Sequence, residues 1–281
     1  MNTRKVWYVT GASQGLGLSL VKKLLTEGYR VAATSRSAET LIKSTGMNSG
    51  EQFLPLEVDL TDPVSIQQSI RQTNDTFGQL DVIVNNAGYG MDGTVEELTE
   101  QQIRDIFTIN VFATINVTKS ALPFLRRQRS GHIINISSVA GFAGAPGWAI
   151  YSATKAAVIA FSEVLAADIK ELGINVTVVG PSGFRTGFLT KSSLVHADSK
   201  IDDYKTVKNT QDRYAAMDGK QAGDPEKAAA LFIGLGENPD PPLHLWLGTD
   251  ALNRAAQKIG SLNEELEKWR ALSIAADFKE E

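Results

Sequence analysis

The feature that most constrains this chain is a regular alternation between short apolar runs and longer segments with helical spacing. Seven runs rich in β-branched and aromatic residues are predicted to be strands: Val6–Thr10, Tyr29–Ser35, Phe53–Leu60, Val82–Asn85, His132–Ser137, Asn175–Val179 and His244–Leu247. The segments with helical spacing are Gly15–Glu27, Pro63–Phe77, Thr99–Arg127, Tyr151–Leu172 and Pro225–Leu235. This alternation is typical of βαβ units, so we predict an α/β fold with a doubly wound parallel sheet and helices on both faces.

Two regions interrupt this rhythm. Residues 187–222 are polar and weakly periodic, and they are too long for a plain connection. They are either a lid over a substrate or a solvated excursion with a helix or two of its own. Residues 250–281 are helix-prone, with Leu262, Leu266, Trp269 and Leu272 at helical spacing, which indicates core packing or an oligomer contact. No linker or repeat divides the chain, so we predict a single domain over residues 1–281, with a substrate loop at 187–222 and a C-terminal helical extension at 250–281.

Composition excludes several classes of protein. The chain is 42% hydrophobic and 21% charged with a net charge of −4, as expected for a globular protein without a basic surplus. Nucleic acid and anionic membranes are therefore not expected as partners. There is no cysteine, and His132, His196 and His244 are too far apart in sequence for a metal-ligand motif, so no metal site is predicted. No signal sequence or apolar run of transmembrane length is recognised, and a cytoplasmic location is expected.

A glycine-rich loop follows the first predicted strand and leads directly into a helix. It reads Thr10-Gly11-Ala12-Ser13-Gln14-Gly15-Leu16-Gly17. Glycines there allow a tight turn and close approach of phosphate, while the helix N-terminus favours the anion. A glycine turn alone is common, but one between a strand and a helix predicts the dinucleotide site of a Rossmann fold. The residues expected to contact the cofactor are Gly11, Ser13, Gln14, Gly15, Leu16 and Gly17.

The end of the second strand predicts the type of cofactor. In dinucleotide folds an acidic residue at this point binds the ribose 2′-OH and repels a 2′-phosphate. This chain has Ser35 and Arg36 there instead of a carboxylate. Arg36 can make a charge-assisted contact to a 2′-phosphate, so NADP(H) is predicted, the alternative being an ordinary surface arginine.

The next two strands end in further candidate cofactor residues. Ligands bind at the carboxyl ends of strands in open α/β sheets, and the third strand ends at Asp59 and Leu60. Asp59 is expected to hold the adenine amino group, or else to serve as a helix N-cap or turn residue. The fourth strand runs into Asn86, Ala87 and Gly88, which are also expected to contact the cofactor.

Chemistry is predicted at a tyrosine and a lysine four residues apart. Tyr151 and Lys155 lie on one face of a helix, where the ammonium is expected to lower the pKa of the phenol toward the range of a general acid/base. The fifth strand ends in Ser137-Ser138, which places hydroxyl groups at the same edge of the sheet. One of them can donate a hydrogen bond to a substrate carbonyl.

Together these motifs resemble the short-chain dehydrogenase/reductase family, in order, over roughly residues 4–186. The family's T-G-x-x-x-G-x-G matches Thr10 to Gly17, and its N-N-A-G matches Asn85 to Gly88. Its asparagine, serine, tyrosine and lysine match Asn110, Ser138, Tyr151 and Lys155; Ser137 is the poorer match. The resemblance implies that Ser138 positions the carbonyl and Tyr151 exchanges the proton. It also implies that Lys155 binds the nicotinamide ribose, that Asn110 supports a water path, and that the chain forms a dimer or tetramer.

The chain departs from the family after the sixth strand. The usual Pro-Gly is replaced by Pro181-Ser182-Gly183-Phe184-Arg185-Thr186, with the glycine displaced by one position. Pro181, Gly183, Phe184 and Thr186 are expected near the nicotinamide. The aromatic residues Tyr89, Trp148 and Phe188, and also Phe184, are candidates to line a substrate pocket, although aromatic residues at loop ends can equally be ordinary packing.

These residues predict an NADP(H)-dependent oxidoreductase, a carbonyl reductase or alcohol dehydrogenase, that acts on a small carbonyl or secondary alcohol. One alternative is a non-catalytic NADP(H) sensor, because a fold does not by itself give a function. Another is a sugar-nucleotide epimerase-like enzyme, which would share the tyrosine and lysine chemistry. Substrate identity, stereochemistry and reaction direction are not predicted.

Overall fold

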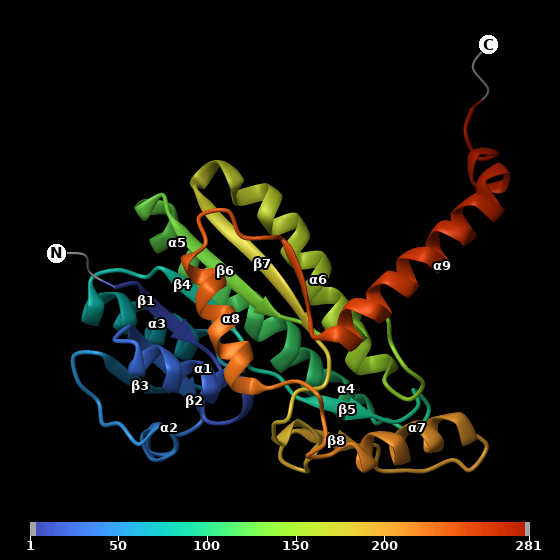
Figure 1. Cartoon of the computed structure of the whole chain (residues 1–281), viewed down its shortest axis with the longest axis horizontal. Helices are drawn as coiled ribbons and strands as arrows, with labels where there is room; N and C mark the ends of the chain where they lie inside the picture. The colour runs from blue at the N-terminus through green and yellow to red at the C-terminus, as the bar shows by residue number, and fades with distance from the viewer. Residues whose placement is uncertain (1–3, 279–281) are drawn as a thin grey trace.

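A computed structural model describes residues 4–278 of the chain. Its centre is a seven-stranded parallel sheet in the order β3-β2-β1-β4-β6-β7-β9 (Figure 1). The strands are β1 Val6–Val9, β2 Arg30–Ser35, β3 Phe53–Glu57, β4 Val82–Asn85, β6 Gly131–Ile136, β7 Ile174–Pro181 and β9 His244–Leu247. All seven predicted strands are confirmed, as is the doubly wound single-domain architecture. The order reverses between β1 and β4, which is where ligands bind in such sheets.

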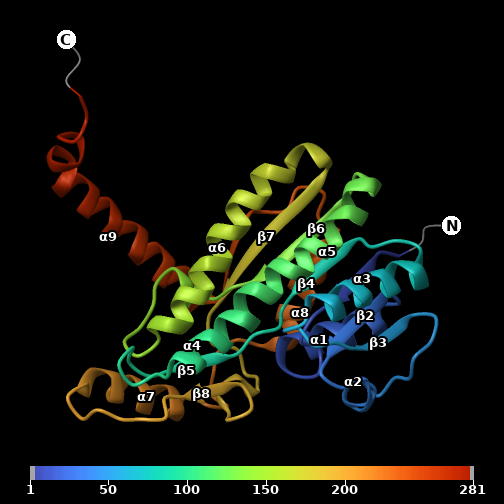
Figure 2. The same cartoon turned by 180° about the vertical axis from the view of Figure 1, so that it is seen from behind.

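Both faces of the sheet are buried, and the side chains of β1 show how. Trp7 and Val9 point into one core with α1 Gly15–Thr26, α2 Ala38–Thr45 and α8 Pro225–Glu237. Val6 and Tyr8 point into the other with α3 Pro63–Phe77, α5 Ala113–Gln128 and α6 Ala149–Ile169. Parallel strands covered on both sides need continuous apolar sequence, which is why the strand signals were strong. Figure 2 shows the same layers from behind.

The predicted helix Thr99–Arg127 is one continuous helical run with a defect in it. Its parts are α4 Glu100–Phe107, a π-helical segment Thr108–Phe112 and α5. Thr99 caps α4 through a reciprocal arrangement with Gln102. Such π segments are uncommon and are often found at functional sites. Here the segment contains Asn110, one of the expected site residues.

The insertion 187–222 has secondary structure of its own. It contains a short 3-10 helix Gly187–Leu189, strand β8 Leu194–His196 and helix α7 Lys205–Ala216. β8 pairs in parallel with β5 Gly90–Asp92, which directly follows the Asn-Asn-Ala-Gly loop. The buried carboxylate of Asp92 fastens the insertion, because its Oδ1 lies 2.7 Å from His196 Nδ1 and 3.3 Å from Gln211 Nε2. The insertion has a helix of its own and is largely exposed, as the solvated alternative expected, while these contacts join it to the body. Its role as a lid stays a prediction.

The C-terminal helix α9, Thr249–Ile274, is mostly exposed, which contradicts one of the two roles expected for it, core packing. Only its first two turns pack on the body, through the buried Ala251 and Ala255. Leu266, Trp269 and Leu272 are all more than half exposed, so core packing is the wrong explanation for this stripe. The outer part of α9 extends away from the sheet in both views (Figures 1 and 2).

Among residues 4–278, one helical run, Ala149–Leu172, is long and apolar enough by length and composition to cross a membrane. The expectation that no run reaches this length is therefore wrong. The run consists of α6 and the short turn after it, and α6 packs on β7 in the body. Core helices of ordinary globular proteins pass the same test, so the finding carries little weight.

Candidate active site

The glycine-rich loop is held so closely against its neighbours that side chains are excluded at two positions. A Cβ added to Gly11 would lie 2.8 Å from Ala87 Cα, and one added to Gly17 would lie 2.5 Å from Asn86 Nδ2. Gly11 and Gly15 also have positive φ angles of 63° and 59°, which L-residues rarely adopt. The glycine pattern therefore has a steric cause in this fold.

The N-terminus of α1 is free to accept an anion. Gln14, the residue before the helix, makes no capping hydrogen bond, and the first turn contains no acidic side chain. The free N–H groups and the helix dipole favour negative charge at this end. The Gln14 amide instead donates to Ser193 Oγ at 2.8 Å, which links the loop to the insertion. A cradle of glycines beside an uncapped helix start fits a dinucleotide phosphate.

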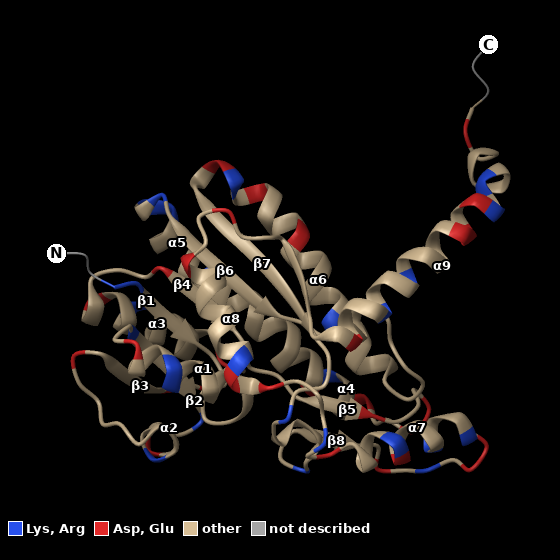
Figure 3. Ribbon diagram, viewed as in Figure 1, with Lys and Arg blue, Asp and Glu red and all other residues tan. Residues whose placement is uncertain are grey.

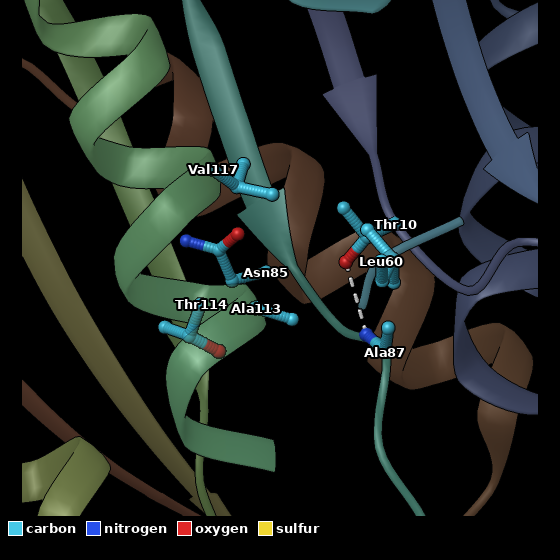
Figure 4. Close-up of a pocket in the computed structure, with 7 residues that line it drawn as sticks. All are labelled: Thr10, Leu60, Asn85, Ala87, Ala113, Thr114 and Val117. Atoms are coloured by element: carbon cyan, nitrogen blue, oxygen red, sulfur yellow. Dashed lines mark hydrogen bonds between the residues drawn. The ribbon is translucent and has the colours of Figure 1, made fainter. Parts of the chain in front are cut away.

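Thr10 and Asn86 lock the first loop to the one after β4. The Asn86 amide donates to Thr10 O at 2.9 Å and to Gly11 O at 3.1 Å. In return Thr10 Oγ1 accepts from the backbone N–H groups of Asn86 and Ala87, both at 3.0 Å, the second of which is drawn in Figure 4. The two loops consequently form one rigid floor. The side chain of Asn86, expected to contact the cofactor, is engaged in holding this floor.

Beside that floor lies a small interstice between side chains that has no room for a water molecule. Its lining residues come from β1, β4, α5 and the end of β3 (Figure 4), and they are Thr10, Leu60, Asn85, Ala87, Ala113, Thr114 and Val117. Leu60 is thus placed beside the loop residue Ala87, and its contact with the cofactor stays a prediction.

Arg36 follows β2 and Asp59 follows β3, and the two side chains differ in their hydrogen bonds and exposure. Arg36 is exposed, directly after Ser35, whose hydroxyl donates to Ser37 O at 2.6 Å. Asp59 Oδ1 accepts from the backbone and the hydroxyl of Thr61, and these bonds lower the pKa of its carboxyl group. Asp62, not Asp59, caps α3, so the N-cap alternative for Asp59 is wrong and the turn alternative is confirmed.

Tyr151 and Lys155 lie in the first two turns of α6, and both side chains are buried. Ser138 follows β6, and its hydroxyl accepts from Ala140 N at 3.1 Å and interacts with Tyr151. Lys155 Nζ lies 5.9 Å from the Tyr151 ring centre and donates to Ile136 O at 3.0 Å. The structure therefore brings together the three residues that the sequence proposed.

Ser137 is not part of this group. Its hydroxyl is buried and donates to the backbone carbonyl of Lys155 in α6 at 2.7 Å. The choice of Ser138 over Ser137 therefore agrees with the geometry, because only the Ser138 hydroxyl is directed toward the phenol.

Burial, not the charge of Lys155, dominates the protonation of the pair. Burial raises the pKa of Tyr151 to about 12, the Ser138 hydroxyl opposes this rise, and Tyr214 adds to it. Burial also lowers the pKa of Lys155 to about 8. The expectation that Lys155 lowers the pKa of Tyr151 is wrong for this geometry, because Nζ faces a backbone carbonyl and both groups are desolvated. At neutral pH Tyr151 is a protonated phenol.

Asn110 is fixed by the loop that follows Gly88. Its Oδ1 accepts from Tyr89 N at 3.0 Å, and its Nδ2 donates to Tyr89 O at 3.0 Å and to Thr154 Oγ1 at 3.1 Å. A Cβ on Gly88 would lie 2.9 Å from Asn110 Oδ1 and 3.3 Å from Lys155 Nζ. Asn110 thus joins the Asn-Asn-Ala-Gly loop to α6 beside Lys155.

The unusual segment 181–186 extends the sheet edge by one residue. Ser182 N donates to Leu247 O at 3.0 Å, while Gly183 O accepts from Gly223 N at 3.0 Å. Thr186 lies opposite the glycine loop, since a Cβ on Gly15 would be 3.7 Å from Thr186 Cβ. Phe184 is half-buried and packs with Leu16 against the core under α1 and α8, outside the apolar cluster around Tyr151. Its expected position near the nicotinamide stays a prediction.

An apolar cluster surrounds the Tyr151 ring. Trp148 packs edge-on at 5.4 Å between ring centres, and Phe188 lies at 6.0 Å. Tyr89 belongs to the same cluster, so three of the four aromatic candidates for the pocket wall are gathered beside Tyr151. The sequence analysis missed Met91, Leu194 and Tyr214, of which Tyr214 packs on Trp148 at 5.0 Å. They lie on β5, β8 and α7, short elements whose position over the site has no local sequence signal.

Comparison with known proteins agrees with this architecture. The family model described as short chain dehydrogenase matches residues 5–195. Oxidoreductase BOA17 of Botryotinia fuckeliana is 35% identical over 97% of this chain and 99% of its own length. A short-chain dehydrogenase from Streptomyces avermitilis has a TM-score of 0.88 at 34% identity, covering 98% of this chain and 100% of that one.

A further solved structure, ElxO with NADP bound, has a TM-score of 0.72 at 26% identity, covering 86% of this chain and 96% of that one. The match of the family model over most of the chain, together with a full-length relative that is an oxidoreductase, establishes the family. This chain belongs to the short-chain dehydrogenase/reductase family.

Proposed function

We propose that this protein is an NADP(H)-dependent oxidoreductase that interconverts a carbonyl and a secondary alcohol, with Tyr151 as the general acid/base. One observation carries the proposal: a buried phenol with Ser138 and Lys155 beside it lies at the same sheet edge as the glycine cradle. A protonated phenol and a serine hydroxyl can both address one substrate oxygen.

When bound, the reduced nicotinamide supplies the hydride. Ser138 donates a hydrogen bond to the substrate carbonyl and orients it toward Tyr151. Tyr151 then gives its proton to the oxygen as the carbon is reduced, and its pKa of about 12 keeps it protonated for this step. In this proposal Lys155 binds the nicotinamide ribose through its buried ammonium group. Asn110 holds the backbone of Tyr89 and the hydroxyl of Thr154, and the water path implied by the family resemblance is part of the proposal.

The cofactor choice rests on Arg36. The side chain is exposed at the end of β2, where its guanidinium can pair with a 2′-phosphate. A hydrogen bond to a charged group contributes about 1.5–3 kcal/mol, which is roughly a tenfold to hundredfold effect on Kd. Arg36→Ala should therefore weaken NADPH binding by at least about tenfold and leave NADH binding within about twofold. Lys43→Ala, an exposed cation on α2, is the matched control. Equal NADH and NADPH affinities that Arg36→Ala leaves unchanged would refute the NADP(H) preference.

The substrate is proposed to be a hydrophobic ketone, aldehyde or secondary alcohol. Trp148, Phe188 and Tyr89 form an apolar wall beside Tyr151, and residues 187–222 place further side chains over it. The insertion acts as a lid in this proposal, because it contacts both the wall, through Tyr214, and the cofactor loop, through Ser193. Closing such a lid would exclude water from the transfer.

The deciding experiment follows NADPH absorbance against a panel of carbonyl compounds graded by chain length and ring size. Tyr151→Phe keeps the ring packing and should lower kcat by about a hundredfold or more without changing NADPH affinity. An activity that survives this substitution would show that the acid/base assignment is wrong. Tight NADPH binding without turnover of any carbonyl or alcohol would instead favour the sensor. Conversion of a sugar nucleotide without net change in NADPH would favour the epimerase-like alternative.

A further inference from the structure

The segment 186–194, here named the strap, runs from the glycine-rich loop to the apolar side chains around Tyr151. At its start Thr186 lies over the glycine loop, since a Cβ added to Gly15 would be 3.7 Å from Thr186 Cβ. Two residues later Phe188 reaches the apolar cluster, where its ring centre lies 6.0 Å from that of Tyr151. The strap therefore spans the distance between the proposed phosphate site and the proposed acid/base.

Ser193 fastens the strap on two sides. Its backbone O accepts from Gly90 N at 2.8 Å, beside the pairing of β8 with β5. Its hydroxyl accepts from the side-chain amide of Gln14 at 2.8 Å. Ser193 is buried, and its neighbour Leu194 belongs to the apolar cluster of Tyr151. The hydrogen bond from Gln14 thus ends one residue away from the substrate wall.

Gln14 is free to make this contact because it does not cap α1. As the residue before the helix it has an extended backbone and forms no capping hydrogen bond. The insertion is also fastened to the segment after the Asn-Asn-Ala-Gly loop, where Glu97 accepts from Ile201 N at 2.8 Å. Within residues 4–278, the bond between Gln14 and Ser193 is the one hydrogen bond that joins the glycine-rich loop to the insertion.

We infer that Gln14 is a positioning residue for the substrate wall and that it acts through Ser193. This inference rests on the proposed function, because it assigns the glycine loop to the cofactor and the apolar cluster to the substrate. The amide of Gln14 holds the strap on the cofactor cradle, and the strap holds Phe188 beside Tyr151. Loss of one neutral hydrogen bond changes an equilibrium by about two- to tenfold, so without this bond the strap opens correspondingly more often.

Trypsin reports opening of the strap directly, because Lys191 is exposed in its middle. Cleavage of a transiently opened segment follows the population of its open form. Basic side chains also lie along the outer part of α9 (Figure 3), where the exposed Lys268 serves as an internal control. In the full-length protein without cofactor, Gln14→Leu and Ser193→Ala should each speed cleavage after Lys191 by about two- to tenfold and leave cleavage after Lys268 unchanged. The double variant should be no faster than the faster single variant, because both changes remove the same bond.

Two variants control for the substitution itself. Gln14→Glu keeps the length of the side chain, and the Ser193 hydroxyl can donate to the new carboxylate, so cleavage after Lys191 should stay at the wild-type rate. The same variant should weaken NADPH binding, because it places a negative charge beside the phosphate site. Gln101→Leu removes an exposed amide of α4 that bonds to Asp105, and it should leave cleavage after Lys191 unchanged.

Kinetics separate a positioning role from a general loss of structure. For the carbonyl compound of the panel that the wild type reduces fastest, Gln14→Leu should raise KM by about two- to tenfold, with kcat and the Kd of NADPH within about twofold. Wild-type cleavage after Lys191 in Gln14→Leu, or cleavage as fast in Gln14→Glu as in Gln14→Leu, would overturn the positioning role. A wild-type protein that binds no NADPH would instead refute the proposed function, while cleavage without cofactor still decides the role of the strap.

Discussion

Lys155 is expected to cost the protein stability at neutral pH, and Lys155→Met should reveal this cost. The ammonium is buried, and burial lowers its pKa from 10.5 to about 8. One pKa unit corresponds to about 1.4 kcal/mol, so the charged side chain costs the free protein about 3 kcal/mol near pH 7. The variant also loses the hydrogen bond to Ile136 O, and this loss offsets about 1–2 kcal/mol of the stability gained. Lys155→Met should therefore raise the free energy of unfolding by about 1–2 kcal/mol while it abolishes turnover.

The pH dependence of this effect has a definite sign. Between about 8 and 10.5 the unfolded chain binds more protons at Lys155 than the folded chain, so wild-type stability gains from rising pH in this window. Tyr8 and Tyr151, whose pKa values burial raises, act in the opposite direction above about pH 10. Subtracting the variant curve from the wild-type curve removes these shared contributions.

Urea unfolding of both proteins at about pH 7 and about pH 9.5, without cofactor, measures the difference. The advantage of Lys155→Met should shrink by about 2 kcal/mol between the two pH values, because wild-type Lys155 increasingly loses its proton. Lys155→Gln, which keeps a polar end, is the companion variant. A variant that is less stable than the wild type at pH 7, or an advantage that does not change with pH, would refute the desolvation argument.

Three further predictions test other parts of the site. Gly17→Ala should abolish cofactor binding and destabilise the protein by about 1–3 kcal/mol, because the new Cβ meets Asn86 Nδ2. Gly234→Ala in α8, where a Cβ meets nothing within 4 Å, should stabilise the protein by about 0.5–1 kcal/mol in the same thermal unfolding assay. The rate of alcohol oxidation should rise with pH up to about 10, because oxidation needs the phenolate and the Tyr151 pKa of about 12 keeps the phenol protonated. The rate of carbonyl reduction should fall little over the same range. Steady-state rates in both directions measure this, and a loss of rate at low pH in the oxidation direction alone would support it. Asn110→Ala should lower the free energy of unfolding by about 1–3 kcal/mol, because it leaves the backbone groups of Tyr89 without their partner. Thermal unfolding of Thr108→Ala, a half-buried position in the same π segment, separates this loss from a general effect on the helix.

The sheet could be predicted because strands buried on both faces leave a strong local signal. The residues of β1, β4 and β6 form nearly unbroken apolar runs. Neighbouring parallel strands also need a crossover connection, usually a helix, which gives the alternation of strand and helix patterns. The expected site residues were also predictable, because motifs at the carboxyl ends of parallel strands must meet at one edge. The short strands β5 and β8 were missed, since three-residue strands depend on contacts with distant parts of the chain. Helix α7 was expected only as part of one alternative for residues 187–222, without its position.

The sequence by itself determined the fold, the family and the set Ser138, Tyr151 and Lys155, since periodicity and motif spacing are local properties of the chain. Only the tertiary structure decided the protonation of that set, because desolvation depends on what packs around Tyr151 and Lys155. It also placed Tyr214 beside Trp148, packed the half-buried Phe184 with Leu16 against the core, and left the outer stripe of α9 uncovered. These outcomes depend on contacts between segments far apart in the chain.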